Sequence, residues 1–269
     1  GQQAAYDTYL ARAADGGDRR LVLTEAHQPA FSPGGGWLAL NGERDLQENL
    51  LIVRPNGSGL QEITEHTEDG LPAWSPDGRS LAFSSTRHGD RQSRIYVIDS
   101  VPIGGSKAQG RPLKVGFGDA RGHYPAWTAG GQVVYSGCDY STTPVRCGLL
   151  LLSAGPGPQT TSQVTDHPGD TAPAVYGSRI AFMSDREGNW QIYLVNLDGS
   201  GLLQLTDSPA RDALPTWSPD GSKIAFVSDE GGVWAVWAVD DDGSNRRKLF
   251  DIGGSLGPDW PQERISWAP

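Results

Sequence analysis

The sequence has no long hydrophobic run, no helical periodicity and very few sulfur-containing residues. Its 269 residues include 2 Cys and 1 Met, and no stretch approaches the roughly 18 consecutive apolar residues that suggest a membrane-spanning helix. The four leucines at 149–152 are typical of a buried strand instead. Gly1 stands where an initiator Met is expected and no secretory signal follows it, so a removed signal or anchor stays open.

Basic charge and catalytic motifs are also scarce. Lys and Arg number 22 against 32 Asp and Glu, which gives a formal net charge of −10 at pH 7. Nucleic-acid phosphates need a basic footprint, so we expect no nucleic-acid partner. The sequence contains no Gly-x-Ser-x-Gly elbow and no phosphate-binding Gly-x-x-x-x-Gly-Lys loop. We therefore expect a protein that is not an enzyme.

The sequence contains a repeated motif, Pro-x-Trp-Ser-Pro-Asp-Gly, which is followed by an apolar triplet that ends in Phe. It is complete at residues 72–83 and again at 215–226. Weaker copies begin at Pro29, Pro125 and Pro173, and residues 265–269 carry the start of another. The phrase recurs with a period of roughly 40 to 50 residues, which indicates a repeat architecture. Its anchor residues are Phe31, Trp74, Trp127, Val175, Trp217 and Trp267.

Each repeat is predicted to contain four short antiparallel strands. Pro-Asp-Gly favours a tight turn after the first strand. The apolar runs at 95–98, 192–195 and 236–239 are typical of strands buried on both faces. Asx-Gly pairs such as Asn56-Gly57 favour the hairpin before the fourth strand. Four-stranded repeats without helices predict the blades of a β-propeller.

We therefore predict an all-β fold, a six-bladed β-propeller that forms a single domain over residues 1–269. Its blades would start near residues 29, 72, 125, 173, 215 and 265. Residues 8–24 match the second half of a repeat and would complete the last blade, although that blade's second strand is missing from both ends. The N- and C-terminal segments would then close the ring in one blade and remove its exposed strand edges. We expect a monomer.

The repeats resemble those of the TolB-type six-bladed propeller, which carry Trp-Ser-Pro-Asp-Gly followed by Ile-Ala-Phe. Besides the two complete copies, residues 184–193 match a typical mid-repeat phrase of that family, and the resemblance covers about residues 8 to 269. It implies a module for non-enzymatic protein or peptide binding, a sensor or scaffold, or an accessory ectodomain of a larger bacterial protein such as a receptor kinase or a peptidase. The motif is specific for the fold, and a fold alone does not determine function.

The two cysteines lie in the loop between the predicted second and third strands of one repeat. Cys138 and Cys147 would stand on the two legs of a hairpin, where a disulfide is geometrically easy. A disulfide would indicate an oxidising compartment, either the periplasm or the cell exterior. The alternative is a pair of reduced thiols, and a zinc site is disfavoured because no His lies nearby in the sequence.

An Asp stands three residues before the strand-opening Pro in three repeats. Asp69, Asp170 and Asp212 therefore share one repeat position, in loops expected to surround the mouth of the central channel. Together they could bind Ca²⁺ or attract a cationic ligand, although the sequence requires no cofactor. The alternative is that each Asp caps its own loop through backbone N–H groups.

Two further patterns bear on this region. An Arg follows the second strand in Thr86-Arg87 and Asp185-Arg186, and we interpret it as a link between neighbouring blades through bidentate contacts. His66, His123 and His167 fall in the same loops as the three Asp residues. The alternative function is therefore a metal-dependent lyase or hydrolase with its site at the channel mouth, although their unequal offsets from the following Pro do not by themselves define a metal centre.

Two tryptophans fit no position of the repeat. The motif residues Trp74, Trp127, Trp217 and Trp267 are predicted to lie in the core between blades, whereas Trp37 and Trp260 have no equivalents. Exposed aromatic side chains are enriched at protein interfaces. We therefore predict that Trp37 and Trp260 form an exposed aromatic patch that contacts a partner.

Overall fold

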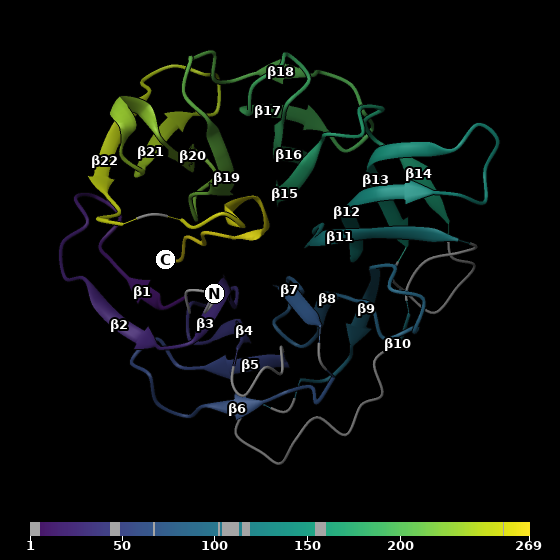
Figure 1. The fold of residues 1–269 in the computed structure, drawn as a ribbon, viewed down its shortest axis with the longest axis horizontal. Helices are drawn as coiled ribbons and strands as arrows, with labels where there is room; N and C mark the ends of the chain where they lie inside the picture. Colours follow the sequence, from purple (N-terminus) through teal and green to yellow (C-terminus); the bar gives the residue numbers. More distant parts are fainter. Residues whose placement is uncertain are drawn as a thin grey trace.

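The computed structural model is a ring of antiparallel β-sheets around a central channel (Figure 1). It describes residues 6–43, 49–66, 68–101, 103, 113–114, 119–153, 160–254 and 256–269. Five four-stranded sheets, numbered here as blades 1 to 5, follow one another in chain order, and strands β1 and β2 form a separate two-stranded sheet.

Each blade is a meander whose first strand lies nearest the ring axis (Figure 1). Blade 1 consists of β3 (Ala26–Phe31), β4 (Leu38–Gly42), β5 (Asn49–Val53) and β6 (Gln61–Glu62). Blade 2 consists of β7 (Asp69–Trp74), β8 (Leu81–Ser85), β9 (Arg94–Ile98) and β10 (Leu113–Lys114). Blade 3 consists of β11 (Ala120–Trp127), β12 (Gln132–Asp139), β13 (Arg146–Ser153) and β14 (Thr161–Gln163).

Blades 4 and 5 follow the same order and are accompanied by two short 3-10 helices. Blade 4 consists of β15 (Thr171–Tyr176), β16 (Arg179–Ser184), β17 (Gln191–Asn196) and β18 (Leu203–Gln204). Blade 5 consists of β19 (Asp212–Trp217), β20 (Lys223–Ser228), β21 (Ala235–Asp240) and β22 (Arg247–Asp251). The helices are η2 (Glu230–Gly232) and η3 (Trp260–Gln262).

The expectation of six four-stranded blades is wrong. Residues 8–24 form only β1 (Thr8–Leu10) and β2 (Arg20–Leu23), which in the described part of the chain pair only with each other. The last repeat copy does not join them as a strand. It lies instead beside blade 1, where the Phe31 N–H donates to Ser266 Oγ at 3.1 Å. The physical reason is the missing second strand, because without it no backbone ladder can connect the C-terminal segment to β1.

The Ser-Pro-Asp-Gly turns form as the sequence predicts. Ser75 Oγ donates to Asp77 Oδ1 at 2.6 Å, and the same carboxylate oxygen accepts from the Arg79 N–H at 3.1 Å. Gly78 has a φ of 68°, a left-handed conformation that favours glycine. The same arrangement recurs at residues 218–222. Each turn therefore satisfies its own polar groups before the second strand begins.

The motif tryptophans fasten each blade to the one before it. The indole N–H donates to a backbone carbonyl on the innermost strand of the preceding blade, one residue before that blade's anchor position. The indole ring can therefore pack between two sheets while its N–H stays hydrogen-bonded. These bonds join Trp74 to Ala30 at 3.2 Å, Trp127 to Ala73 at 3.1 Å and Trp217 to Ala174 at 3.0 Å. Blades 1 and 4 carry Phe31 and Val175 at the anchor position, and neither side chain can donate such a bond.

Every innermost strand contains a β-bulge at the residue before its proline. The pairing register with the second strand shifts there in all five blades. Bulges bend a strand and re-aim its side chains, and here they turn one residue of each blade toward the ring axis. These residues have φ between 49° and 56°: Gln28, Leu71, Tyr124, Ala172 and Leu214.

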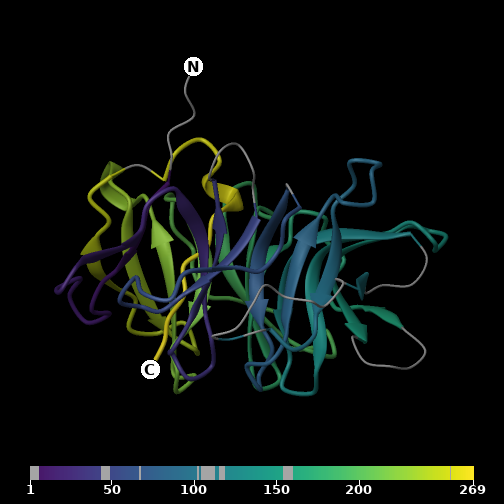
Figure 2. The ribbon, with the colours of Figure 1, turned by 90° about the horizontal axis from the view of Figure 1, so that it is seen from below.

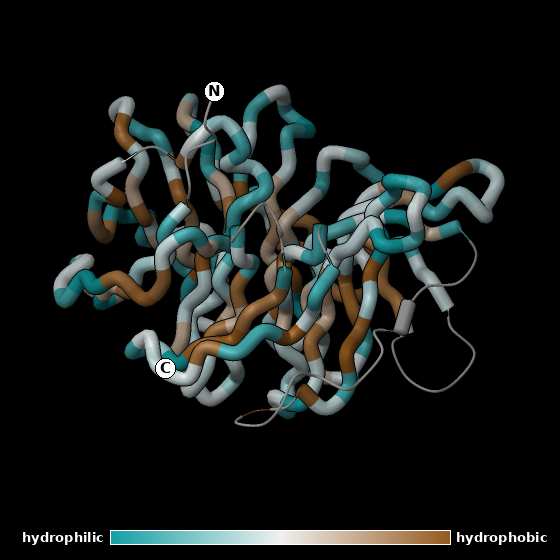
Figure 3. Tube along the Cα trace, turned by 60° about the horizontal axis from the view of Figure 1, so that its bottom comes forward, coloured by the Kyte–Doolittle hydropathy of each residue, from teal (hydrophilic) through white to brown (hydrophobic). Residues whose placement is uncertain are grey.

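The core lies between the blades, and the channel lies along the axis. The second-strand residues Phe83, Phe182 and Phe226 are fully buried, and the hydrophobic segments run along the strands while the turns are hydrophilic (Figure 3). Seen from the side, the C-terminal residues run through the ring from one face to the other (Figure 2). None of the helices in the described residues is long and apolar enough to span a bilayer.

Candidate functional site in the central channel

The C-terminal segment, residues 256–266, is held inside the ring by side chains from several blades. The Tyr124 hydroxyl of blade 3 donates to the Pro261 carbonyl, and burial raises the pKa of Tyr124, so it stays protonated. Gln28 Nε2 of blade 1 donates to the Gln262 carbonyl at 2.9 Å, while its Oε1 accepts from the Leu71 N–H at 2.7 Å. Two of the bulged side chains therefore anchor this segment.

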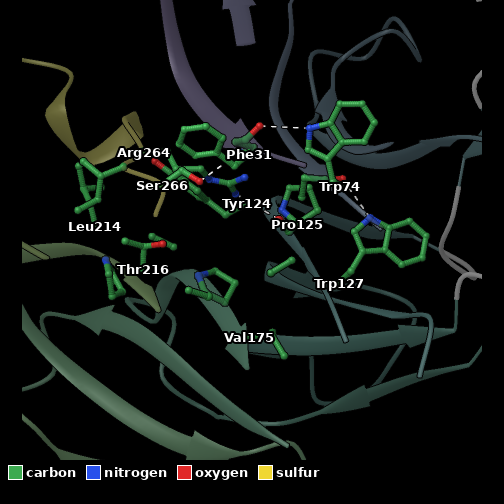
Figure 4. A pocket seen from close by; sticks show the side chains of 18 of the residues that line it. Phe31, Trp74, Tyr124, Pro125, Trp127, Val175, Leu214, Thr216, Arg264 and Ser266 are labelled. Carbon is green, nitrogen blue, oxygen red and sulfur yellow. Dashed lines mark hydrogen bonds between the residues drawn. The ribbon is translucent and has the colours of Figure 1, made fainter. Parts of the chain in front are cut away.

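Beside this segment the channel contains a cavity of about 190 Å³. The innermost strands of all five blades and residues 263–266 line it. Figure 4 shows Arg264 and Ser266 of the C-terminal segment near Tyr124 and Pro125. The rest of the lining is mixed, with Glu263 and Thr216 among alanine, proline, valine and aromatic side chains. A concave site of this kind, with few polar groups among apolar ones, is typical of ligand-binding sites.

Arg264 supplies the positive charge of this cavity. Its guanidinium donates to the carbonyl of Pro72 in blade 2 and, at 3.2 Å, to that of Pro125 in blade 3. Loss of bulk water around the charged group lowers the pKa of Arg264 to about 10, so it remains protonated at neutral pH. Sequence analysis missed this residue. Aligned on Trp267, it occupies the same repeat position as the five bulged residues, and that alignment is the signal that would have identified it.

Glu263, the neighbouring residue, is paired with blade 1. His27 Nδ1 lies 2.9 Å from Glu263 Oε1, and Asn41 Nδ2 lies 3.1 Å from His27 Nε2. Because the Asn41 amide donates to Nε2, the Nδ1–H of a neutral imidazole can donate to the carboxylate. Tyr6 stacks on the same imidazole with ring centroids 5.4 Å apart. The C-terminal segment is thus fixed on both sides of Arg264.

The three Asp residues at the shared repeat position are all buried, and each is paired with an Arg. Asp170 accepts from Arg186 Nη2 at 2.7 Å on both carboxylate oxygens and from Ser184 Oγ at 2.6 Å. Asp69 accepts from Arg87 Nη2 through Oδ2 alone. The two arginines belong to the same blades as their Asp partners, so the interpretation of Arg87 and Arg186 as links between neighbouring blades is wrong.

Blade 5 builds the same pair from a different part of the chain. Asp212 lies 3.3 Å from Arg246 Nη2, and Arg246 comes from the residue before β22 rather than from the end of β20. Burial raises the pKa of Asp212 even though Arg246 opposes the shift. In all three blades the guanidinium also covers two aromatic rings of the second and third strands. These rings are Phe83 and Tyr96, Phe182 and Tyr193, and Phe226 and Trp237.

Because their charge is neutralised by Arg, the three carboxylates are placed as counterions inside separate blades. Among the residues that the structure describes, no group of three or more His, Cys, Asp or Glu side chains is arranged to hold a metal ion. A calcium ion shared by Asp69, Asp170 and Asp212 stays a prediction, which binding measurements can test.

The three candidate histidines do not share one centre. His66 Nδ1 lies 3.8 Å from Asp69 Oδ1 in blade 2, and His167 Nδ1 lies 3.7 Å from Asp170 Oδ1 in blade 4. His123 of blade 3 contacts the ring of Tyr124 with centroids 5.0 Å apart. Each His therefore belongs to the environment of its own blade.

The exposed aromatic patch predicted from Trp37 and Trp260 does not form. The two side chains are only 9% and 8% exposed. Arg54 lies over Trp37 at 4.6 Å, and Trp260 in η3 packs against Trp190 and Trp234 with centroids 6.2 and 5.4 Å apart. The sequence position of each Trp outside the repeat does not reveal these partners, which come from other segments.

The disulfide prediction is confirmed by the structure. Cys138 and Cys147 face each other on β12 and β13 with their Cα atoms 4.1 Å apart and their sulfurs bonded. Both strands extend to eight residues here. The bond therefore joins the two legs of the hairpin that projects beyond blade 3.

Comparisons with known proteins agree with this fold. Residues 157–263 match the TolB beta propeller domain family. A solved structure of putative TolB from Agrobacterium tumefaciens superposes with a TM-score of 0.69 at 27% identity, covering 87% of this chain and 85% of that one. TolB from Acinetobacter baumannii superposes with a TM-score of 0.76 at 18% identity, covering 98% of this chain and 63% of that one.

A longer relative shares most of the chain. The uncharacterized peptidase YuxL of Bacillus subtilis is 25% identical over 216 residues, which are 76% of this chain. The chain spans only 29% of the length of YuxL. The matched domain model, the superposed structures and the repeated motif all agree that the chain is a β-propeller similar to those of TolB proteins.

Proposed function

We propose that this propeller is a non-enzymatic binding module that holds a protein or peptide segment in its central channel. The observation that carries the proposal is the cavity of about 190 Å³ between the five blades and residues 263–266. Its walls combine apolar proline and alanine side chains with the charged Arg264. The cavity is too small for a folded domain, so the bound element is a peptide or a loop that extends from a larger partner.

The proposal can be tested by filling the cavity. Thr216 lines the cavity in blade 5, and Thr216→Trp would occupy much of the open space. We expect a pooled library of short peptides to shift the indole N–H resonances of Trp74 and Trp127 in the unmodified protein, because both residues line the cavity. The Thr216→Trp variant should lose these shifts. A matched control is Thr160→Trp, at an exposed position outside the cavity.

The outcomes separate cleanly. Saturable shifts in the unmodified protein and in Thr160→Trp, but not in Thr216→Trp, support binding in the channel. Unchanged indole resonances with every peptide pool contradict the proposal. Equal binding to both Trp variants also contradicts it, because the ligand would then sit elsewhere.

We also propose that the protein works outside the cytoplasm, as a periplasmic or extracellular module of a larger protein. The bonded cysteines Cys138 and Cys147 support this, since structural disulfides persist in oxidising compartments. The test is to block free thiols at the moment of cell lysis and to measure by mass spectrometry how much of the pair is alkylated. Full alkylation without prior reduction would contradict the proposal.

A second candidate function, a metal-dependent lyase or hydrolase, has one observation in its favour. A His stands less than 4 Å from the buried Asp at the shared position in both blade 2 and blade 4. Titration with Mn²⁺ and Ca²⁺ by calorimetry tests it. Stoichiometric Mn²⁺ binding that is lost in His66→Ala or His167→Ala would favour the enzyme, whereas calcium binding alone would favour the binding module.

A further inference from the structure

We propose that the channel recognises a carboxylate, and that Arg264 is the residue that binds it. This rests on the proposed function and specifies the chemistry of the ligand. The group can be the C-terminal carboxylate of a peptide or the side chain of an acidic residue, since both present the same two oxygens to a guanidinium.

Arg264 differs from the other interior arginines in its partners. Arg87, Arg94, Arg186 and Arg246 each pair with at least one carboxylate. Arg264 has no carboxylate within 4 Å in the part of the chain that the structure describes. Its hydrogen-bond acceptors are the carbonyls of Pro72 and Pro125, which carry only partial charge. The ring interior thus holds one cation whose charge no described side chain neutralises.

The guanidinium also has N–H donors that these two hydrogen bonds do not use. Arginine carries five N–H donors, and two are used on the two carbonyls. None of the nitrogen atoms of Arg264 is both buried and unpaired, and the residue lines the cavity. The Nε–H, which has no hydrogen-bond partner among the described residues, is therefore open to solvent on a residue that lines the cavity, and each terminal nitrogen has a second N–H besides the one used.

The neighbouring acid, Glu263, also lines the cavity but is paired with another residue. The Glu263 carboxylate points to His27 at 2.9 Å, and the Tyr124 hydroxyl donates to a backbone carbonyl. The loss of solvation that lowers the pKa of Arg264 is the cost of holding a charge here without an anion. A bound carboxylate would offset that cost by forming charge-assisted hydrogen bonds in a site with little water.

The cavity walls fit a small residue next to the carboxylate. Val175 lies across the cavity from Arg264 and Ser266 (Figure 4), and Pro125 and Pro173 also line the cavity. These walls offer apolar contacts to one or two small side chains. We therefore expect a carboxylate that follows a small apolar residue to bind better than a bulky or basic group.

The experiment compares three short peptides on the intact chain at fixed ionic strength, by calorimetry and by NMR. The probes are N-acetyl-Ala-Ala with a free carboxylate, its C-terminal amide, and N-acetyl-Ala-Asp amide. We expect at least one of the two acids to bind roughly tenfold or more tightly than the neutral amide, since hydrogen bonds to charged groups are the stronger ones. The acid that binds more tightly shows whether the channel prefers a C-terminal carboxylate or an acidic side chain.

Variants and a direct signal locate the binding. Arg264→Gln should remove the preference for the acids, Arg264→Lys should retain part of it, and the exposed Arg20→Gln is the matched control. Because Arg264 also joins two blades, its variants can fail to fold. The Nε–H resonance of Arg264 in the unmodified protein then decides, and it should move with the acids and not with the amide.

Four results would overturn the inference. Equal affinity for the acids and the amide would contradict recognition of a carboxylate but would not contradict the proposed peptide binding. A folded Arg264→Gln that keeps the preference, or an Arg264 Nε–H signal that stays in place at saturation, would place the carboxylate elsewhere. If none of the three peptides binds, the inference fails, and the pooled peptide library decides whether the proposed peptide binding stands.

Discussion

Replacing Asp170 by Ala should be one of the most damaging single changes in the blades. The carboxylate is fully buried and is the acceptor for Arg186 and Ser184. Without it the Arg186 side chain, only 14% exposed, keeps its charge and loses its carboxylate partner. Removing one member of a buried ion pair typically costs about 3–5 kcal/mol because the other charge stays uncompensated.

A second pair provides the matched comparison. Arg211 and Asp229 in blade 5 lie 2.6 Å apart but are 45% and 21% exposed. Solvent screens such a pair, so Asp229→Ala should cost about 1 kcal/mol or less. Both pairs join an Arg to an Asp within one blade, so the comparison isolates the effect of burial.

Urea unfolding followed by tryptophan fluorescence measures both changes through the shift of the midpoint at constant slope. The double variant Asp170→Ala, Arg186→Ala should be less destabilised than the sum of the two single variants, because it removes the stranded charge. If Asp170→Ala costs no more than Asp229→Ala, the reasoning is refuted, and the buried pair is not a counterion arrangement.

Four further outcomes follow from the same structure. Trp127→Phe removes the indole donor to Ala73 and should cost about 1 kcal/mol in urea unfolding, whereas an unchanged midpoint would show that the bond between blades is unimportant. The pKa of Asp220 is lowered to about 2 by the Ser218 hydroxyl, so its contribution to stability is present above its ordinary pKa of 3.8 and is lost as pH falls toward 2. The melting temperatures of the unmodified protein and Asp220→Asn should therefore converge over that range, and a constant difference would contradict this. Replacing both cysteines by Ser should lower stability by roughly 2–3 kcal/mol, and a difference that persists after reduction of the unmodified protein would assign the loss to the substitutions themselves. Calcium titration of the unmodified protein and of Asp69→Asn tests the predicted shared calcium site, where Asp69 also pairs with Arg87, and equal calcium binding by both would contradict that site.

Local features were the most predictable from the sequence. The Ser-Pro-Asp-Gly turns depend on contacts within a few residues, such as Ser75 with Asp77, so the sequence specifies them almost completely. The disulfide was predictable for the same reason, because Cys138 and Cys147 lie directly opposite each other on one hairpin. The period of the repeat then predicted a propeller, since each blade needs its neighbours to bury its faces.

Features that depend on distant segments were not predictable in this way. The number of complete blades depends on whether residues 8–24 and 265–269 pair. Repeat matching identified the missing second strand but did not predict that its absence leaves the two segments unpaired. The partner of Asp212 is Arg246, which lies before the fourth strand of blade 5. In blades 2 and 4 the arginine partner follows the second strand instead. Trp260 is buried by Trp190 and Trp234 for a similar reason.

Arg264 is the residue of the candidate site that the sequence analysis did not predict. The last repeat copy is degraded, and its match to the repeat begins only at Ile265, so the residue before it was not predicted to belong to a site. Aligning that copy with the bulged positions of the five blades places Arg264 at the ring axis. The structure adds what the alignment lacks, which is the set of acceptors, Pro72 and Pro125, that leave the charge without a counterion.

The most direct test of the account is a crystal structure of the protein grown with the peptide acid that binds best. The account predicts peptide density in the channel cavity, with both carboxylate oxygens within hydrogen-bond distance of the Arg264 guanidinium and the last side chain against Pro125 or Val175. Density for the peptide on the outer strands or in the turns, with the cavity containing only solvent, would contradict it.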